Sequence, residues 1–306
     1  MRTLALAVTL LTAFWSGCSR APREPLAAAT APGPAPSGSQ DSVYDFSWAR
    51  DALWDDGQSE VALYDARRPQ YAQIESYQAL LIVVKEDFTP RHNVKADPPY
   101  QGKNTYPVLK LNAVHSYWTG KYPYHFLASV FVHRDNPAAL VKLTVGSQEW
   151  CGNTFKEVTT WGPTPALVSH SYFDGQGDAT YPLDLRAGDL LEDQLPLALR
   201  SLAFRDGLSF QRRLLPSLIS NNLRRPPGFV PATITVTGEE VLSTGAGRLP
   251  AWKLNVRWED VQQTWWFEKA APHALLKMES SDGRVWLLRA RSRKRYWQEP
   301  TYRPEM

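Results

Sequence analysis

Alternation of apolar and polar side chains at every second residue is the feature that most constrains this chain. In the segment from Tyr122 to His133, one face carries only apolar or aromatic residues: Tyr124, Phe126, Ala128, Val130 and Val132. Because successive side chains of a strand point to opposite faces, this spacing predicts a strand with one buried face. The preceding segment, Tyr106 to Trp118, is also strand-like, and Thr119-Gly120 between them predicts a hairpin turn.

Short strand-like segments of this kind recur along most of the chain. They are Ser76–Glu86, Leu140–Gly146, Asn153–Thr160, Leu167–Phe173, Thr233–Ser243, Ala251–Trp258, Gln262–Glu268, Leu275–Ser280 and Val285–Arg291. The exception is Asp189–Phe204, where leucines follow helical spacing, Asp189 is a candidate N-cap, and Pro196 predicts a kink or two short helices. We therefore expect a mainly β protein with one or two helices, as an antiparallel curved sheet or incomplete barrel around a short helical segment.

The first residues are typical of a bacterial lipoprotein signal peptide, which we assign to residues 1–17. Arg2 provides a positive start, and Leu4–Phe14 is an apolar run of about eleven residues, shorter than the roughly 20 that a membrane-spanning helix needs. Ser16 and Gly17 lead into Cys18, whose thiol can accept a diacylglyceryl group; Trp15 stands where such lipidation motifs usually have Leu, Val or Ile. A plain secretory signal cut near Gly17 is the alternative.

Beyond the signal peptide, composition divides the chain into a tether and a folded part. Residues 18–43 contain the cysteine and a Pro/Ala-rich stretch that predicts a disordered tether. Residues 44–300 predict a single β-rich domain, with Pro226-Pro227-Gly228 as a boundary between halves 44–225 and 229–300. We expect a protein of the bacterial cell envelope, anchored by lipid and facing the periplasm. Ser19, in place of an Asp, favours the outer membrane over the inner one by resemblance to enterobacterial sorting.

Several segments resemble a family of exported bacterial proteins without an assigned activity. The matching stretches run from LIVVKEDF (81–88) through TGKYPYHFLASVF (119–131), SQEWCG (147–152) and SYF (171–173) to LLED (190–193). Members of that family sometimes carry a septum-formation-inhibitor label, but the arginine-rich phosphate motif of that nucleotide pyrophosphatase family is not found in this sequence. The C-terminal segment 264–290 resembles the closing strands of the half-barrels found in lipoprotein chaperones of the Lol type.

Neither the cysteines nor the histidines form a strong catalytic or metal motif. The only cysteines are Cys18 and Cys151, so a lipidated Cys18 leaves Cys151 without an intrachain disulfide partner. A hydrolase or transferase that uses Cys151 with a histidine is an alternative, in which Gly152 lets the backbone approach an acyl group. The six histidines lack metal-ligand spacing, so we predict no metal and no cofactor. The formal net charge of +3 does not imply nucleic acid, and protein partners are not predicted.

The polar and aromatic residues within the family-like segments are the candidate ligand-binding residues: Glu86, Lys95, Lys110, Asn112, Tyr122, Tyr124, Glu149 and Trp150. If their polar faces turn inward, they line a polar-bottomed cavity; if outward, they form an ordinary solvated face with ion pairs between strands. A ligand site further predicts a cavity of about 300 Å³ or more on the concave face, with Lys110 and Glu149 pointing into it.

The basic C-terminal end also has two interpretations. Arg289, Arg291 and Arg293 either protect an edge strand from unwanted pairing or meet anionic lipid headgroups. The function predicted for the whole chain is non-enzymatic binding of a hydrophobic or amphipathic ligand, with lipid as a candidate. The alternatives are the Cys151 enzyme and a purely structural envelope scaffold.

Overall fold

The computed structural model describes residues 43–223 and 225–299. Its first nine strands are β1 (Ser59–Gln70), β2 (Gln73–Thr89), β3 (Val94–Lys95), β4 (Tyr106–Trp118), β5 (Pro123–His133), β6 (Asn136–Glu149), β7 (Gly152–Thr159), β8 (Ala166–His170) and β9 (Asp178–Pro182). The remaining seven are β10 (Leu190–Leu191), β11 (Ser209–Leu215), β12 (Val230–Thr244), β13 (Gly247–Trp258), β14 (Val261–Glu268), β15 (Leu275–Ser280) and β16 (Val285–Lys294). The signal peptide, Cys18 and nearly all of the tether predicted from the sequence lie outside the described residues.

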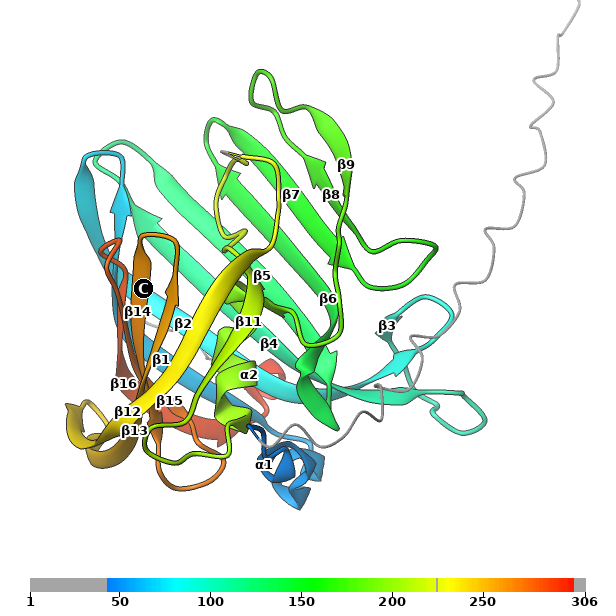
Figure 1. The fold of residues 1–306 in the computed structure, drawn as a ribbon. Helices are drawn as coiled ribbons and strands as arrows, with labels where there is room; N and C mark the ends of the chain where they lie inside the picture. The colour runs from blue at the N-terminus through cyan, green and yellow to red at the C-terminus, as the bar shows by residue number, and fades with distance from the viewer. Residues whose placement is uncertain (1–42, 224, 300–306) are drawn as a thin grey trace, which may run out of the picture.

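The strands form one curved sheet that does not close on itself (Figure 1). Their order is β10-β11-β12-β13-β14-β15-β16-β1-β2-β4-β5-β6-β7-β8-β9, and the short β3 pairs with β2. Every pair of neighbours is antiparallel except the two-residue contact between β10 and β11. The mainly β, antiparallel and incompletely closed architecture predicted from the sequence is therefore confirmed. The sheet crosses the Pro226–Gly228 segment, because β11 before it pairs with β12 after it.

Five strands, β1, β3, β9, β10 and β11, were not predicted, and one predicted strand was misplaced within the sheet. β1 and β11 contain the adjacent arginines Arg67-Arg68 and Arg212-Arg213, which interrupt the apolar alternation. The prediction that the last strand is an edge strand is wrong, since β16 lies between β15 and β1. Its arginines form ion pairs within the molecule instead; Arg291, for example, lies 2.7 Å from Glu268.

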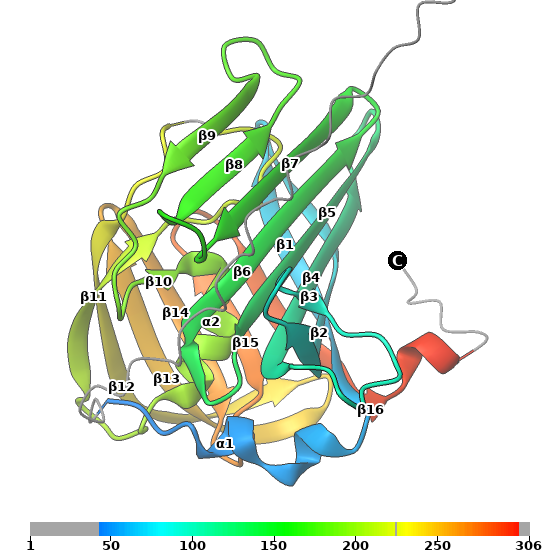
Figure 2. The same cartoon turned by 90° about the vertical axis from the view of Figure 1, so that its right-hand side faces the viewer.

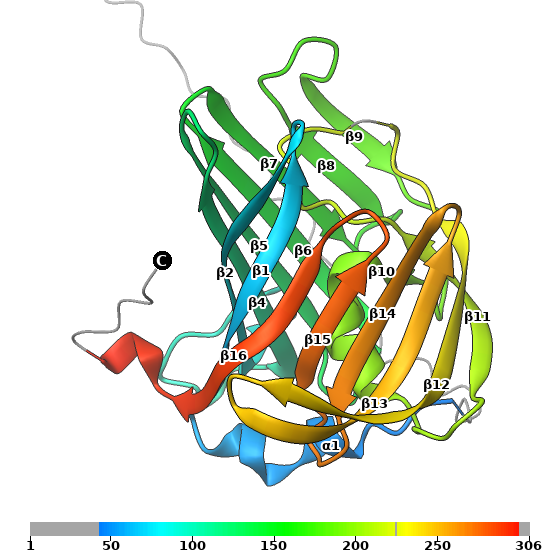
Figure 3. The ribbon, with the colours of Figure 1, turned by 90° about the vertical axis from the view of Figure 1, so that its left-hand side faces the viewer.

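The helical segment predicted inside the curve is present but shorter. It consists of η2 (Glu192–Gln194), α2 (Leu195–Ala198) and η3 (Leu199–Ser201), with Pro196 in the first turn of α2. Asp189 is not its N-cap, because residues 190 and 191 form β10 and the Asp189 carboxylate accepts a hydrogen bond from the Arg186 N–H at 2.8 Å. All ten residues of the segment are buried, and α2 lies within the curve of the sheet (Figure 2, Figure 3).

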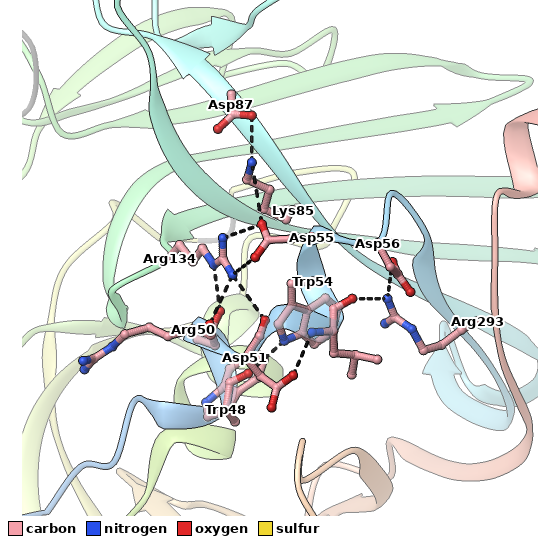
Figure 4. A network of polar contacts seen from close by, with 12 residues as sticks. Trp48, Arg50, Asp51, Trp54, Asp55, Asp56, Lys85, Asp87, Arg134 and Arg293 are labelled. Carbon is pink, nitrogen blue, oxygen red and sulfur yellow. Dashed lines mark hydrogen bonds and ion pairs between the residues drawn. The ribbon is translucent and has the colours of Figure 1, made fainter.

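A second helical segment closes one end of the sheet. It contains α1 (Ser47–Arg50) and η1 (Ala52–Asp55), and a further 3-10 helix, η4 (Tyr296–Gln298), follows β16. Arg134 ties this segment to the sheet, because its guanidinium binds both oxygens of Asp55 at 2.7 Å and donates to the carbonyl of Ala49 at 3.0 Å (Figure 4). Such paired, charge-assisted bonds fix orientation as well as position. No helix in the described ranges is both long and apolar enough to cross a membrane.

Candidate functional site

A cavity of about 650 Å³ lies on the concave face of the sheet. Ligand pockets in proteins commonly measure about 300–1,000 Å³, and the cavity falls within this range. The sequence-based expectation of a cavity of at least about 300 Å³ on this face is therefore met. Its lining comes from three places: the strands β1, β2, β4 and β5, the strands β13–β16, and two further segments, the buried one around residue 192 and the mostly half-buried one at 216–222.

The first wall follows directly from the alternation in β4. Leu111, Ala113 and His115 share one face of this strand and line the cavity, whereas Lys110 and Asn112 point to the other face. Across the β4–β5 ladder, His115 lies opposite Phe126, which also lines the cavity. His115 is 2% exposed, and its imidazole Nδ1 lies 3.0 Å from the Tyr77 hydroxyl on β2. Burial, together with the nearby positive charge of Arg68, lowers the pKa of His115 to about 3, so the ring is neutral at physiological pH.

The opposite wall is aromatic. Trp258, Trp265, Met278 and Trp286 line it from β13, β14, β15 and β16 respectively. The Trp286 ring stacks on His115 with 5.5 Å between ring centroids, so the two walls meet there. Large aromatic rings give a cavity much apolar surface with few polar atoms, which suits an apolar ligand chain.

Glu192 is the centre of a polar network at the floor of the cavity. Its Oε1 accepts hydrogen bonds from Gln263 at 2.8 Å and forms an ion pair with Arg284 at 2.7 Å. Its Oε2 accepts from the backbone N–H of Ser217 at 2.8 Å, and Gln263 in turn accepts from the Trp265 indole N–H at 3.0 Å. These polar groups form hydrogen bonds and ion pairs with one another, so none of them needs a ligand as its partner.

The loop at residues 216–222 forms one side of the cavity and is held by a buried lysine of β7. The Lys156 ammonium, on a side chain only 1% exposed, donates to the backbone carbonyls of Leu218 at 3.1 Å, Ser220 at 2.7 Å and Asn222 at 3.0 Å. Burial lowers the pKa of Lys156 to about 8. Three carbonyls converging on one cation fix the path of the loop.

Asp193 holds the start of the same loop from the helical segment. Its carboxylate accepts from the Ser217 hydroxyl at 2.5 Å and from the Leu218 N–H at 2.8 Å. Burial, and then the neighbouring Glu192, raise the pKa of Asp193 to about 6. The loop that walls the cavity thus depends on two buried groups of opposite charge.

The TGKYPY and SQEWCG segments lie side by side at the β4–β5 and β6–β7 turns, since Tyr124 in β5 faces Glu149 in β6. Tyr124 is 1% exposed, and its ring stacks on Tyr117 with 5.5 Å between centroids. Its hydroxyl bonds that of Tyr71 at the tip of the β1–β2 hairpin, and Tyr71 lines the cavity. The structure therefore brings Tyr122, Tyr124, Glu149 and Trp150 to the same end of the β5–β6 ladder, and Tyr71, an exposed lining residue, connects this end to the mouth of the cavity.

The other four candidates lie elsewhere. Lys110 forms an ion pair with Glu86 on the convex face, and Asn112 accepts a hydrogen bond from the Ser129 hydroxyl at 2.7 Å. Lys95 is exposed in the short β3. Neither these four nor Tyr122, Tyr124 and Trp150 line the cavity, so the expectation that Lys110 and Glu149 point into it is wrong. Glu149 does not line it either, although its carboxylate accepts from the side chain of Asn221, a lining residue, at 2.9 Å.

Cys151 is exposed at the β6–β7 tip and has tyrosines as its neighbours. A hydrogen bond between the Cys151 thiol and the Tyr122 hydroxyl is the main cause that raises the pKa of Tyr122. Beside it, Gly152 packs against the Tyr172 ring, where an added Cβ would lie 2.6 Å from a ring carbon. The space beside the Gly152 backbone, which the sequence analysis assigned to an acyl group, is therefore filled by the Tyr172 ring. The described residues contain no cluster of three or more His, Cys, Asp or Glu side chains that could hold a metal ion.

The sequence analysis did not single out Arg68, His115 or Trp286 as site residues. His115 could have been found, because it continues the series Leu109, Leu111 and Ala113 on the apolar face of its strand. Comparison of the chain with protein-family models, with curated proteins and with solved structures finds no match.

Proposed function

We propose that this protein is a lipid-anchored envelope lipoprotein whose curved sheet binds one hydrophobic or amphipathic ligand in the concave cavity. The observation that carries the proposal is a cavity of about 650 Å³ between an aromatic wall of tryptophans and the His115 wall. A core that needed no ligand would close this space with side chains, because protein interiors pack with few voids larger than a water molecule.

The mouth of the cavity supports an amphipathic ligand drawn from a lipid environment. Tyr71 at the mouth is 72% exposed, and Trp118 and Trp150, which are 63% and 72% exposed, contact each other on neighbouring hairpin tips. Exposed Trp and Tyr suit the boundary between water and lipid, since each combines an apolar ring with a polar atom.

Binding is tested by native mass spectrometry of the full chain after detergent exchange, with a variant that fills the cavity. Ala113 lines the cavity, so Ala113→Phe should abolish co-purification of ligand. Its neighbour Val114 lies on the opposite face of β4, and Val114→Phe is the matched control that should retain ligand. A wild-type protein that remains ligand-free after exposure to membrane lipid extract contradicts the proposal.

The anchor is tested separately, because Cys18 lies outside the described residues. The proposal includes lipidation of Cys18, a periplasm-facing domain and the outer membrane in preference to the inner one. It also includes membership of the exported family with the TGxYPY and SQEWCG segments. Radioactive palmitate should label the wild type and not Cys18→Ser. Equal labelling of both would remove the anchor from the proposal without affecting the cavity.

A further inference from the structure

Arg68 differs from the other arginines that line the cavity. Arg225 has its carboxylate partner in Glu259 at 3.0 Å, and Arg284 has Glu192 at 2.7 Å. For Arg68, the one hydrogen bond of its guanidinium within the described ranges runs from Nη2 to the carbonyl of Ile219, and it is long at 3.4 Å. Its Nε is buried and has no hydrogen-bond partner. Within the described ranges Arg68 forms no ion pair, although Glu75 lies opposite it in the β1–β2 ladder.

The surroundings of Arg68 favour a negative partner. The guanidinium lies over the ring of Phe126 at 4.8 Å and that of Tyr117 at 5.5 Å from the ring centroids. These rings hold the group in place and exclude water from its faces, and they leave the N–H edge free to donate. A charge in such an environment gains more from an ionic partner than it would in open water.

His115 supplies a second donor to the same space. It lies opposite Phe126 in the β4–β5 ladder, and its Nε2 is buried without a hydrogen-bond partner. The Tyr77 hydroxyl lies 3.0 Å from Nδ1 of the neutral ring, and we assign the tautomer in which this hydroxyl donates to Nδ1 and the ring proton is on Nε2. Leaving a buried donor unpaired is unfavourable, so two such donors on residues that line one cavity indicate a missing acceptor.

We infer that the ligand carries an acid group, a carboxylate or a phosphate ester, which accepts hydrogen bonds from Arg68 and His115 while its apolar part lies along the tryptophan wall. The inference rests on the proposed function and narrows it to anionic amphiphiles. An alcohol or a neutral ester accepts hydrogen bonds but does not balance the charge of Arg68. The oxygens of an oxyanion meet both donors and balance that charge.

The test compares probes of equal chain length by calorimetric titration of the full chain at neutral pH. The probes are laurate, dodecyl phosphate and dodecanol. We expect laurate or dodecyl phosphate to bind the wild type at least roughly tenfold more tightly than dodecanol, because a charge-assisted bond in a partly buried site contributes at least that much. The tighter of the two acids identifies the acid group. Equal binding of dodecanol and both acids overturns the inference and leaves the proposed function standing, whereas binding of none of the three probes contradicts both.

Variants of two adjacent arginines locate the effect. Arg68→Gln should remove the preference for the acids and leave dodecanol binding unchanged. Arg67→Gln removes the same charge from the neighbouring, exposed position and should keep the preference. If the Arg68→Gln variant still binds the acids more tightly than dodecanol, the inference is also overturned. Thermal unfolding of both variants checks the fold, and the comparison of probes in the wild type needs no variant.

Discussion

Replacing Glu60 by Gln removes the negative charge that balances Arg200 inside the molecule. The Arg200 side chain is 2% exposed, and its two Nη atoms contact the two Glu60 carboxylate oxygens at 2.9 and 3.1 Å. Its Nε donates to the carbonyl of Pro272 at 2.8 Å, and the guanidinium lies 4.5 Å from the ring centroid of Trp48. Arg200 belongs to η3, at the end of the helical segment that underlies the cavity, so the pair joins that segment to β1.

The size of the effect follows from burial. Removing one partner of a buried ion pair leaves the other charge without compensation, which costs about 3–5 kcal/mol. We expect Glu60→Gln to lower the free energy of unfolding by about 3 kcal/mol or more. For a domain of this size the melting temperature should fall by roughly 2–4 °C per kcal/mol.

Urea unfolding of the full chain at neutral pH measures the effect, with Glu239→Gln as the matched control. Glu239 and Lys269 form an ion pair in which both side chains are more than one third exposed, and such surface pairs contribute at most about 1 kcal/mol. If Glu60→Gln unfolds within about 1 kcal/mol of Glu239→Gln, the reasoning is refuted. The double variant Glu60→Leu/Arg200→Met should recover most of the loss, because it leaves no unpaired buried charge.

Three further predictions concern the loop and the rim of the cavity. The folded protein holds the Asp193 proton more tightly than the unfolded chain, since the Asp193 pKa is raised from 3.8 to about 6. The free energy of unfolding should therefore fall as pH rises from about 4 to 6, and urea titrations should show a smaller fall in Asp193→Asn. Lys156→Met removes the cation that holds the 216–222 loop, so amide hydrogen exchange in that loop should quicken at least roughly tenfold while exchange in β4 stays the same; unchanged loop exchange would contradict this role. Gly152→Ala should destabilise the protein by about 1 kcal/mol through its contact with Tyr172, and the added cost should disappear in a Tyr172→Ala background, as unfolding of the single and double variants would reveal.

Local patterns were sufficient to predict most strands. The predicted segments Tyr106–Trp118 and Leu275–Ser280 coincide with β4 and β15. The alternation in β5 correctly separated the buried face, from Tyr124 to Val132, from the outer face that carries His125. Such features follow from the two-residue repeat of a strand and involve no distant residue.

The sequence did not predict which distant strands pair or which strand faces turn to the inside of the curved sheet. β1 was missed because Arg67-Arg68 interrupt its alternation, and no local pattern encodes its pairing with β16, which lies more than 200 residues away in the chain. The sequence separated the Lys110 face of β4 from the Leu111 face, but it did not tell which of them turns toward a ligand.

The sequence by itself therefore determined that the chain makes many antiparallel strands, each with one apolar face, around a short helical segment. Only the tertiary structure decided that the apolar faces enclose a cavity, and that Arg68, His115 and Trp286 meet within it from three different strands. The physical reason is that side-chain direction is set by each residue's neighbours along the strand, whereas the space between faces depends on how the whole sheet bends and what fills it.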